Sequence, residues 1–141
     1  REKPLRLRQA EELQETLPPE TREFGRAFCE LLRRVEPVSV DVCLHDGEVL
    51  DWCGGCRVVA TPGHTPGHIS LILENESVVV TGDAMALEDG APAVANPQFA
   101  LDRKQAGASL EKLLSLKAKT YYCYHGGVYS PERTACPGGW N

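Results

Sequence analysis

Apolar residues recur at helical spacing in two parts of the chain, before residue 36 and after residue 102. Within 20–35, charged residues alternate with an apolar set at three- and four-residue intervals: Phe24, Ala27, Phe28, Leu31, Leu32 and Val35. This spacing predicts an amphipathic helix, and a shorter helix is expected around 9–17. Asp102 is a suitable N-cap for a further helix to about Leu116. Its core side would carry Leu110, Leu113 and Leu114.

Between these helices the apolar pattern changes to that of strands. The predicted strands are 38–44, 48–52, 56–60, 68–74, 78–83 and 119–124. Short turns separate the first three and predict a meander of tight hairpins. The apolar sequences of 68–74 and 78–83 indicate a hairpin buried on both faces.

The remaining segments are expected to be irregular. Residues 84–101 contain many breakers and are predicted to form a long loop, and residues from 125 onward a loop and tail. Five residues of the long loop either line a substrate pocket or pack the loop itself: Met85, Pro92, Val94, Asn96 and Phe99.

Composition places the chain among ordinary globular proteins, with 141 residues, 42% hydrophobic and 25% charged. The net charge of −5, without a basic stripe, argues against nucleic acid as the main partner. No apolar run approaches the roughly 18–20 residues of a membrane helix, and the first 13 residues lack the apolar core of a signal peptide. We therefore expect a cytoplasmic protein with reduced cysteines and no membrane contact, acting on a small-molecule substrate.

Polar residues with metal-binding chemistry occur at the ends of the predicted strands. His64 and His68 lie four residues apart, but Pro and Gly within 61–67 exclude a helix that would place them on one face. Asp83 ends the next strand, and His125 follows the last one. Each residue taken singly is more often a surface or turn residue. As a set, imidazole, carboxylate and imidazole suit zinc or a related divalent ion.

Three motifs give a more specific indication: Thr-Pro-Gly-His-Thr-Pro-Gly-His at 61–68, Thr-Gly-Asp at 81–83 and Tyr-His-Gly-Gly at 124–127. Together they resemble the second half of a metallo-β-lactamase-fold hydrolase, over about residues 38–130. The resemblance implies an α+β fold, namely the C-terminal half of an αββα four-layer sandwich. It also implies that His64, Asp83 and His125 are metal ligands. Asp83 would bridge two ions and act in catalysis by orienting the attacking hydroxide.

The resemblance leaves His68 outside the ligand set. It would either contact a ligand or be structural, bonding the backbone at the start of its strand.

Aspartate at position 83, where β-lactamases of the best-known zinc subclass have cysteine, resembles the glyoxalase II and lactonase branches. Hydrolysis of an ester, thioester or lactone is implied. The cofactor would be Zn²⁺, one or two ions in the complete site, with Mn²⁺ or iron as alternatives. An iron branch that reduces oxygen adds a flavin domain that is absent here.

One family motif, His-x-His-x-Asp-His, is missing from the sequence, whose only histidines are at 45, 64, 68 and 125. Residues 1–141 are therefore expected to be a single domain that forms the C-terminal part of the fold. We expect a homodimer or a complex with the missing N-terminal half. His45, beside a turn, is expected to be solvated.

Two other functions stay open. The first is a catalytically silent half-domain that acts by associating with a partner chain. The second is a thiol redox module built on Cys53 and Cys56, although these cysteines flank a hairpin turn and can equally be incidental or form a cross-hairpin disulfide.

Overall fold

The structure is a computed structural model that describes residues 4–134. The chain divides into two compact units, Arg1–Val42 and Cys43–Asn141. Within the described residues no helix has the length and apolar character needed to cross a membrane.

The first unit is a pair of helices, α1 (Leu5–Thr16) and α2 (Arg22–Arg34), joined through the short helix η1 (Pro19–Thr21). Its core consists of Leu7, Ala10 and Cys29, with Phe28 and Leu32 packed against them. A Cβ atom at Gly25 would collide with the side chains of Gln14 and Leu17. The two helices therefore contact each other at the small residues of α2. The buried residues of α2 are Gly25 and Cys29, so its buried face differs from the predicted one. Four residues of the predicted apolar face are exposed instead: Phe24, Ala27, Leu31 and Val35.

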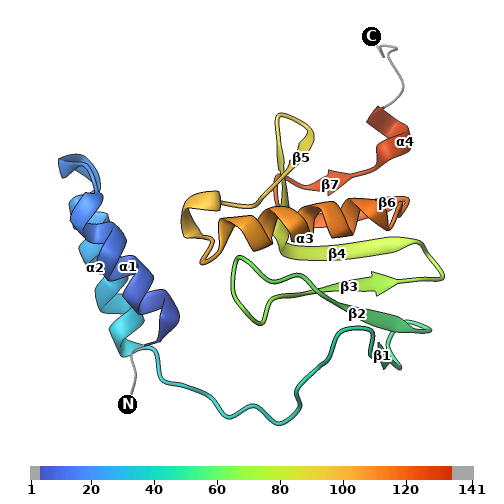
Figure 1. The fold of residues 1–141 in the computed structure, drawn as a ribbon, viewed down its shortest axis with the longest axis horizontal. Coiled ribbons are helices and arrows are strands. Elements are labelled where there is room, and N and C mark those ends of the chain that lie inside the picture. Colours follow the sequence, from blue (N-terminus) through green and yellow to red (C-terminus); the bar gives the residue numbers. More distant parts are fainter. Residues whose placement is uncertain (1–3, 135–141) are drawn as a thin grey trace. The chain divides into compact units, whose positions relative to one another are not determined.

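The second unit is built on one mixed sheet with the strand order β1-β2-β3-β4-β6-β7, in which β5 pairs with β4 (Figure 1). The strands are β1 (Val49–Leu50), β2 (Cys56–Ala60), β3 (Ile69–Leu73), β4 (Val78–Glu88), β5 (Ala91–Ala93), β6 (Thr120–His125) and β7 (Val128–Tyr129). All neighbours are antiparallel except β4 and β6. That parallel pair is joined by a crossover containing η2 (Pro97–Phe99) and α3 (Arg103–Ser115), and α4 (Pro131–Thr134) follows β7. This mixed α+β arrangement confirms the predicted fold class.

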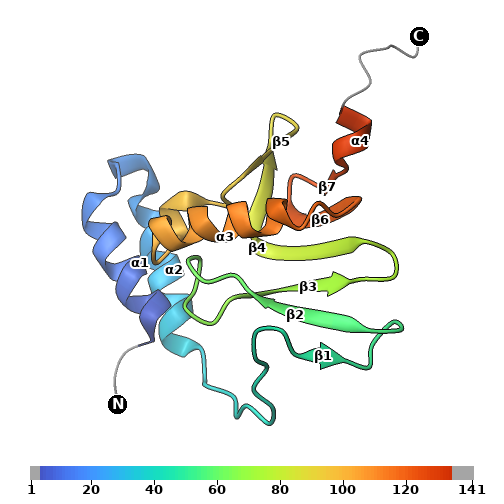
Figure 2. The same cartoon turned by 45° about the vertical axis from the view of Figure 1, so that its right-hand side comes forward.

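Helix α3 covers one face of the sheet (Figures 1 and 2). Leu113 of α3 packs with Val59, Ile72, Val79 and Tyr121 of the sheet in the main core. At the start of the helix the Asp102 carboxylate accepts a hydrogen bond from the Gln105 N–H, which confirms the predicted cap. The crossover helix is thus anchored at its first turn and by its core side.

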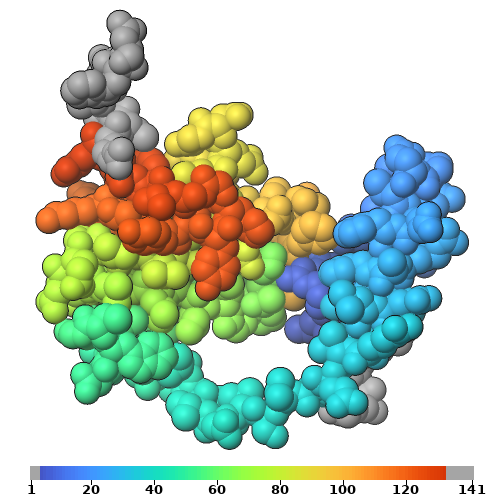
Figure 3. All heavy atoms as spheres, turned by 180° about the vertical axis from the view of Figure 1, so that it is seen from behind, coloured from blue at the N-terminus to red at the C-terminus, as the bar shows by residue number. Residues whose placement is uncertain are grey.

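The opposite face of the sheet carries a row of apolar residues in register across four strands, formed by Val58, Leu71, Val80 and Tyr122. Further along the same face, the side chains become exposed: Tyr122 is 49% exposed, Tyr124 71% and Val128 53%. Figure 3 views the molecule from the side opposite to Figure 1 and shows atoms of these strands, coloured green to orange-red, at the surface. Among the described residues of this unit, 43–134, helices therefore cover only one face of the sheet.

Two predictions about the elements were wrong. Residues 38–44 form no strand, and Val38, Val40 and Val42 are exposed, because their alternating pattern has no partner strand among the described residues. Residues 84–101 are not a long loop: β4 continues to Glu88, turns, and pairs with β5 (Figure 2). Met85 is fully buried in the core and does not line a pocket. Of the Gly and Pro residues that suggested a loop, Gly90 lies in the turn, Pro92 in the short edge strand β5 and Pro97 at the start of η2.

The C-terminal region also contains more structure than expected. Residues 125–134, predicted as loop and tail, include the end of β6, strand β7 and helix α4. The rest of the predicted tail, 135–141, lies outside the described residues.

Candidate metal centre

Asp83 lies in an irregular part of β4. Pairing between β4 and β6 shifts register twice, between Val80 and Gly82 and again between Gly82 and Ala86. Gly82 has a φ of +58°, which favours glycine. The buried Thr81 hydroxyl lies 3.2 Å from the Tyr122 carbonyl oxygen and ties this bulge to β6. The bulge turns the Asp83 side chain out of the regular alternation of the strand.

The loop that carries His64 is held against the first turns of α3. Gly63 has a φ of +135°, and a Cβ atom there would lie 2.2 Å from the Ala106 backbone nitrogen. The Gly63 carbonyl accepts from the Asp102 N–H at 2.9 Å, and the Pro62 carbonyl accepts from the Ser109 hydroxyl at 2.7 Å. The first Pro-Gly-His repeat is therefore fixed by the helix.

His125 occupies the last position of β6, next to Ala86 of β4. The chain then turns at Gly126, whose φ is +85° and where a Cβ atom would lie 2.3 Å from the Leu87 carbonyl oxygen. Glycine is required here because β4 passes so close. This close passage places His125 beside the bulge of β4.

The structure brings together the three predicted ligands. The Asp83 Oδ2 atom lies 3.5 Å from His64 Nε2, and Asp83 Oδ1 lies 3.1 Å from His125 Nε2. Exposure of the side chains increases across the group, from 14% for His64 through 29% for Asp83 to 53% for His125. The site is thus closed on the side of α3 and open to solvent at the end of β6.

His68 lies next to this group but uses both ring nitrogens within the protein. Its Nε2 atom accepts from the Asp83 backbone N–H at 2.9 Å, and its Nδ1 atom lies 2.8 Å from the Thr61 hydroxyl. Burial of the ring lowers the pKa of His68, although the nearby Asp83 carboxylate acts in the opposite direction. His68 therefore contacts the backbone of a predicted ligand, which is the first of the two roles considered for it, and that role stays a prediction.

The donor set meets only some of the requirements of a divalent metal ion. Two donors on one tetrahedral ion with bonds of about 2.0–2.2 Å lie roughly 3.3–3.6 Å apart, close to the two spacings at Asp83. Each imidazole, however, faces a different carboxylate oxygen. Accordingly, residues 4–134 contain no group of three or more His, Cys, Asp or Glu arranged around one ion. The donor types and the spacings fit a divalent metal. Each ion in contact with Asp83 would receive one imidazole nitrogen and one carboxylate oxygen from these residues.

Sequence reasoning missed two residues that belong to this site, Thr61 and Ser70. Both are 1% exposed, and their hydroxyl oxygens lie 2.9 Å apart. Ser70 could have been recognised from the sequence, because it is a polar residue within the apolar strand predicted at 68–74. Its partner Thr61 follows the neighbouring strand β2, and only the pairing of β2 with β3 brings the two hydroxyls together.

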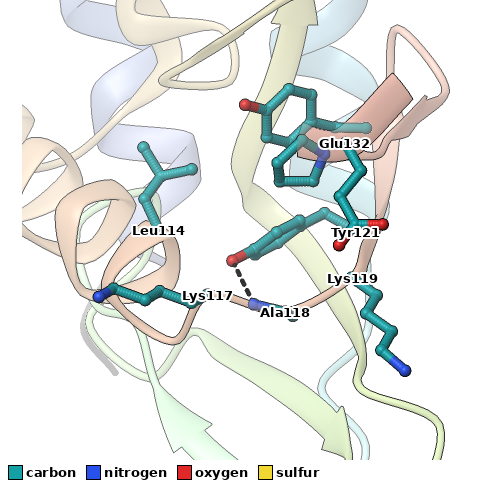
Figure 4. Close-up of a pocket in the computed structure, with 8 residues that line it drawn as sticks. Leu114, Lys117, Ala118, Lys119, Tyr121 and Glu132 are labelled. Carbon is teal, nitrogen blue, oxygen red and sulfur yellow. Dashed lines mark hydrogen bonds between the residues drawn. The ribbon is translucent and has the colours of Figure 1, made fainter. Parts of the chain in front are cut away.

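Other candidate sites are not connected with this group. A pocket of about 400 Å³ lies near the beginning of β6, lined by Leu114, Lys117, Lys119, Tyr121 and Glu132 among others (Figure 4). It contains none of the predicted site residues. Cys53 and Cys56 are free thiols, and burial raises the pKa of Cys56, whereas a reactive thiol needs a lowered one. His45 is exposed on a turn, as expected.

Comparisons with known proteins identify relatives. The model of the metallo-beta-lactamase superfamily matches residues 10–125. A probable metallo-hydrolase of Methanocaldococcus jannaschii is 36% identical over 76 residues, 54% of this chain and 36% of that protein. A hydroxyacylglutathione hydrolase of Methylococcus capsulatus is 34% identical over 100 residues, 69% of this chain and 37% of that protein. The chain thus spans about a third of the length of the curated relatives it matches.

Solved structures show the same likeness. A metallo-beta-lactamase family protein of Thermus thermophilus is 34% identical with a TM-score of 0.58, covering 86% of this chain and 39% of that one. A second structure, determined in a di-iron-bound form, is 32% identical with a TM-score of 0.52, covering 67% of this chain and 44% of that one.

Proposed function

The chain belongs to the metallo-beta-lactamase superfamily, and we propose that it supplies His64, Asp83 and His125 to the metal centre of a hydrolase. The observation that carries this proposal is the contact of one carboxylate, Asp83, with two imidazoles from distant parts of the chain. Buried or half-buried clusters of these residue types are typical of metal centres.

The chemistry follows from the roles of these side chains. A bound divalent ion would supply Lewis acidity, which lowers the pKa of a water ligand and polarises a substrate carbonyl. His64 and His125 would hold the metal through Nε2, and both must be neutral to do so. Asp83 would use its two oxygens separately, one on the side of each imidazole, and would accept a hydrogen bond from the attacking water.

The proposed substrates are carboxylic esters, thioesters or lactones. Aspartate at position 83 resembles the glyoxalase II and lactonase branches, and one relative is named hydroxyacylglutathione hydrolase. An acylglutathione is a thioester, so we rank thioesters first. Zinc is the expected metal, with manganese or iron as alternatives; one solved relative was determined in a di-iron-bound form.

A second candidate function rests on the ligand count. Because each oxygen of Asp83 meets only one imidazole, this chain offers two donors to an ion that needs four or more. A catalytically silent chain that associates with a partner polypeptide is therefore the alternative. In both cases the further ligands would come from polypeptide outside this sequence.

Calorimetric titration of the chain with Zn²⁺ tests the metal site. We expect weak binding of at most about one ion per chain, because half of the ligands are missing. Asp83→Asn should abolish it, whereas Asp46→Asn, the same change at an exposed turn, should not. Unchanged binding in Asp83→Asn, or two tightly held ions per chain, contradicts the proposed site.

Hydrolysis requires a separate assay. The chain is mixed with the N-terminal segment of the Methylococcus relative and offered an acylglutathione, a nitrophenyl ester and a lactone, each with Zn²⁺. Turnover by the mixture that is lost in Asp83→Asn supports the hydrolase. Metal binding without turnover of any of the three substrates favours the silent alternative.

A further inference from the structure

We propose that His68 is a positioning residue that holds the Asp83 bulge through a one-directional chain of hydrogen bonds with Thr61 and Ser70. This inference rests on the proposed role of Asp83 in the metal centre. It assigns a positioning role to His68, Thr61 and Ser70, none of which is a predicted metal ligand.

The chain of bonds begins and ends on the same strand. The Asp83 N–H donates to His68 Nε2 at 2.9 Å, and His68 Nδ1 lies 2.8 Å from the Thr61 hydroxyl. The Thr61 hydroxyl lies 2.9 Å from that of Ser70, which donates to the Thr81 carbonyl at 2.9 Å. The two ends, Asp83 N and Thr81 O, flank Gly82 in β4.

The chemistry of the ends sets the direction of every bond between them. A backbone N–H can only donate and a carbonyl oxygen can only accept. His68 Nε2 must therefore accept, which in a neutral ring places the proton on Nδ1. That proton can only go to the Thr61 hydroxyl, whose own proton goes to Ser70. The Ser70 proton then goes to Thr81, so every donor has one acceptor.

Packing at Gly82 couples the imidazole to the bulge. A Cβ atom on Gly82 would lie 2.7 Å from His68 Nε2 and 2.9 Å from Cε1. The ring thus lies directly against the Gly82 backbone, where a side chain would otherwise project. Rotation of the ring would simultaneously break the bond to Asp83 N and disturb the +58° φ of Gly82.

At Asp83 these hydrogen bonds hold the backbone of β4 in place, which regular strand pairing would otherwise do. Pairing between β4 and β6 is irregular from Val80 to Ala86, so ladder hydrogen bonds do not define the backbone at Asp83. Thr61, Ser70 and Thr81 are each at most 1% exposed, so water does not compete for the bonds between the Thr61 hydroxyl, the Ser70 hydroxyl and the Thr81 carbonyl. The orientation of Asp83 toward His64 and His125 therefore depends on His68.

The tautomer of His68 is the first test, since it needs no substitution. A long-range ¹H–¹⁵N spectrum of the labelled chain at neutral pH should show His68 protonated at Nδ1 and unprotonated at Nε2. The exposed His45, which lacks this arrangement, serves as the internal reference. A proton on Nε2 of His68 overturns the proposal, whether or not the chain binds metal.

The second test uses matched substitutions at Thr61, which contacts no predicted ligand. Thr61→Val preserves shape but removes the hydroxyl, and Thr61→Ser preserves the hydroxyl. We expect Thr61→Val to lose the single His68 tautomer, to speed hydrogen exchange of the Asp83 amide, and to weaken Zn²⁺ binding about 10–100-fold. Thr61→Ser should retain all three properties. Circular dichroism of both variants controls for folding.

The results of these tests distinguish a failure of the positioning role of His68 from a failure of the proposed metal site. If Asp83→Asn abolishes Zn²⁺ binding but Thr61→Val changes neither the tautomer nor the Asp83 amide, the positioning role is wrong and the metal site stands. If Asp83→Asn leaves binding unchanged, the metal site is wrong. The tautomer and amide exchange then still decide whether His68 positions the bulge.

Discussion

At Asp83 a single carboxylate meets two imidazoles, each at a different oxygen. The two imidazoles come from the other two motifs, at 61–68 and 124–127. A carboxylate has two equivalent oxygens and can therefore serve two neighbours, whereas an imidazole offers one nitrogen to a metal.

Alanine substitutions of individual histidines should distinguish the metal ligands from histidines that do not bind metal. His64→Ala and His125→Ala should each abolish Zn²⁺ binding, because the chain has no spare imidazole at this position. His45→Ala should leave binding unchanged, since His45 lies on an exposed turn. Titration calorimetry measures all three. If His68→Ala eliminates binding and His64→Ala leaves it intact, the ligand is assigned to the wrong histidine.

At the scale of elements, the two Pro-Gly-His repeats have different structural requirements. Gly63 has a φ of +135° and lies against the α3 backbone, whereas Gly67 has no positive φ, and a Cβ atom added there would meet no atom within 4 Å. Gly63→Ala should therefore lower the free energy of unfolding by about 1–3 kcal/mol from backbone strain, with the steric overlap adding to this.

Gly67→Ala is the matched control, because it makes the same change in the second copy of the tripeptide. It should change stability by no more than about 0.5 kcal/mol. Urea denaturation of both variants checks the difference. Equal effects of the two substitutions would show that α3 does not press against the first repeat.

The N-cap of α3 predicts a pH dependence. Hydrogen bonds from Gln105, first from its backbone and then from its side chain, lower the pKa of Asp102 in the folded state. The unfolded chain therefore binds more protons in acid, and the contribution of the cap is present above the ordinary aspartate pKa of about 3.9. It is lost as the pH falls through the lower folded value.

Asp102→Ala should accordingly reduce the free energy of unfolding at pH 7, and the difference from the unmodified chain should shrink at pH 3. Asp102 is only partly buried, so salt should weaken the charge contribution. Urea titrations at the two pH values measure this, and a difference that grows in acid would contradict the sign.

At the scale of the whole molecule, we expect the face of the sheet opposite α3 to govern association. Apolar surface stabilises a fold by about 25 cal/mol per Å² when buried. Several hundred Å² left in water would thus forgo on the order of 10 kcal/mol, comparable to the stability of a domain. Tyr122, Tyr124 and Val128 are the most exposed apolar residues of this face.

We therefore expect the isolated chain to self-associate at micromolar concentration, as a homodimer, unless a complementary polypeptide is supplied. Replacing Tyr122 and Tyr124 together by lysine should produce a monomer in light scattering. Trp52→Lys, at an exposed aromatic in the turn between β1 and β2, should not. A monomeric unmodified chain with cooperative unfolding would show that the face needs no cover.

The sequence by itself determined the features that depend on local spacing and on short motifs. The Asp102 cap and the periodic leucines predicted α3, and the strands at 56–60, 68–74 and 78–83 were correctly identified as extended. The three motifs at 61–68, 81–83 and 124–127 indicated the superfamily, which the matched residues 10–125 confirm. His64, Asp83 and His125 were also found in this way, whereas Thr61 and Ser70 were not, and the role of the three as ligands stays a prediction.

Only the tertiary structure decided features that depend on partners distant in sequence. The pattern at 38–44 has the alternation of a strand, but a strand requires a neighbour, and none pairs with it among the described residues. Residues after Asp83 contain breakers, yet β4 continues because its neighbours bury Ala84, Met85 and Ala86. The direction of the bonds from Asp83 through His68 to Thr81 follows from which donors and acceptors meet in space, and sequence spacing carries no such information.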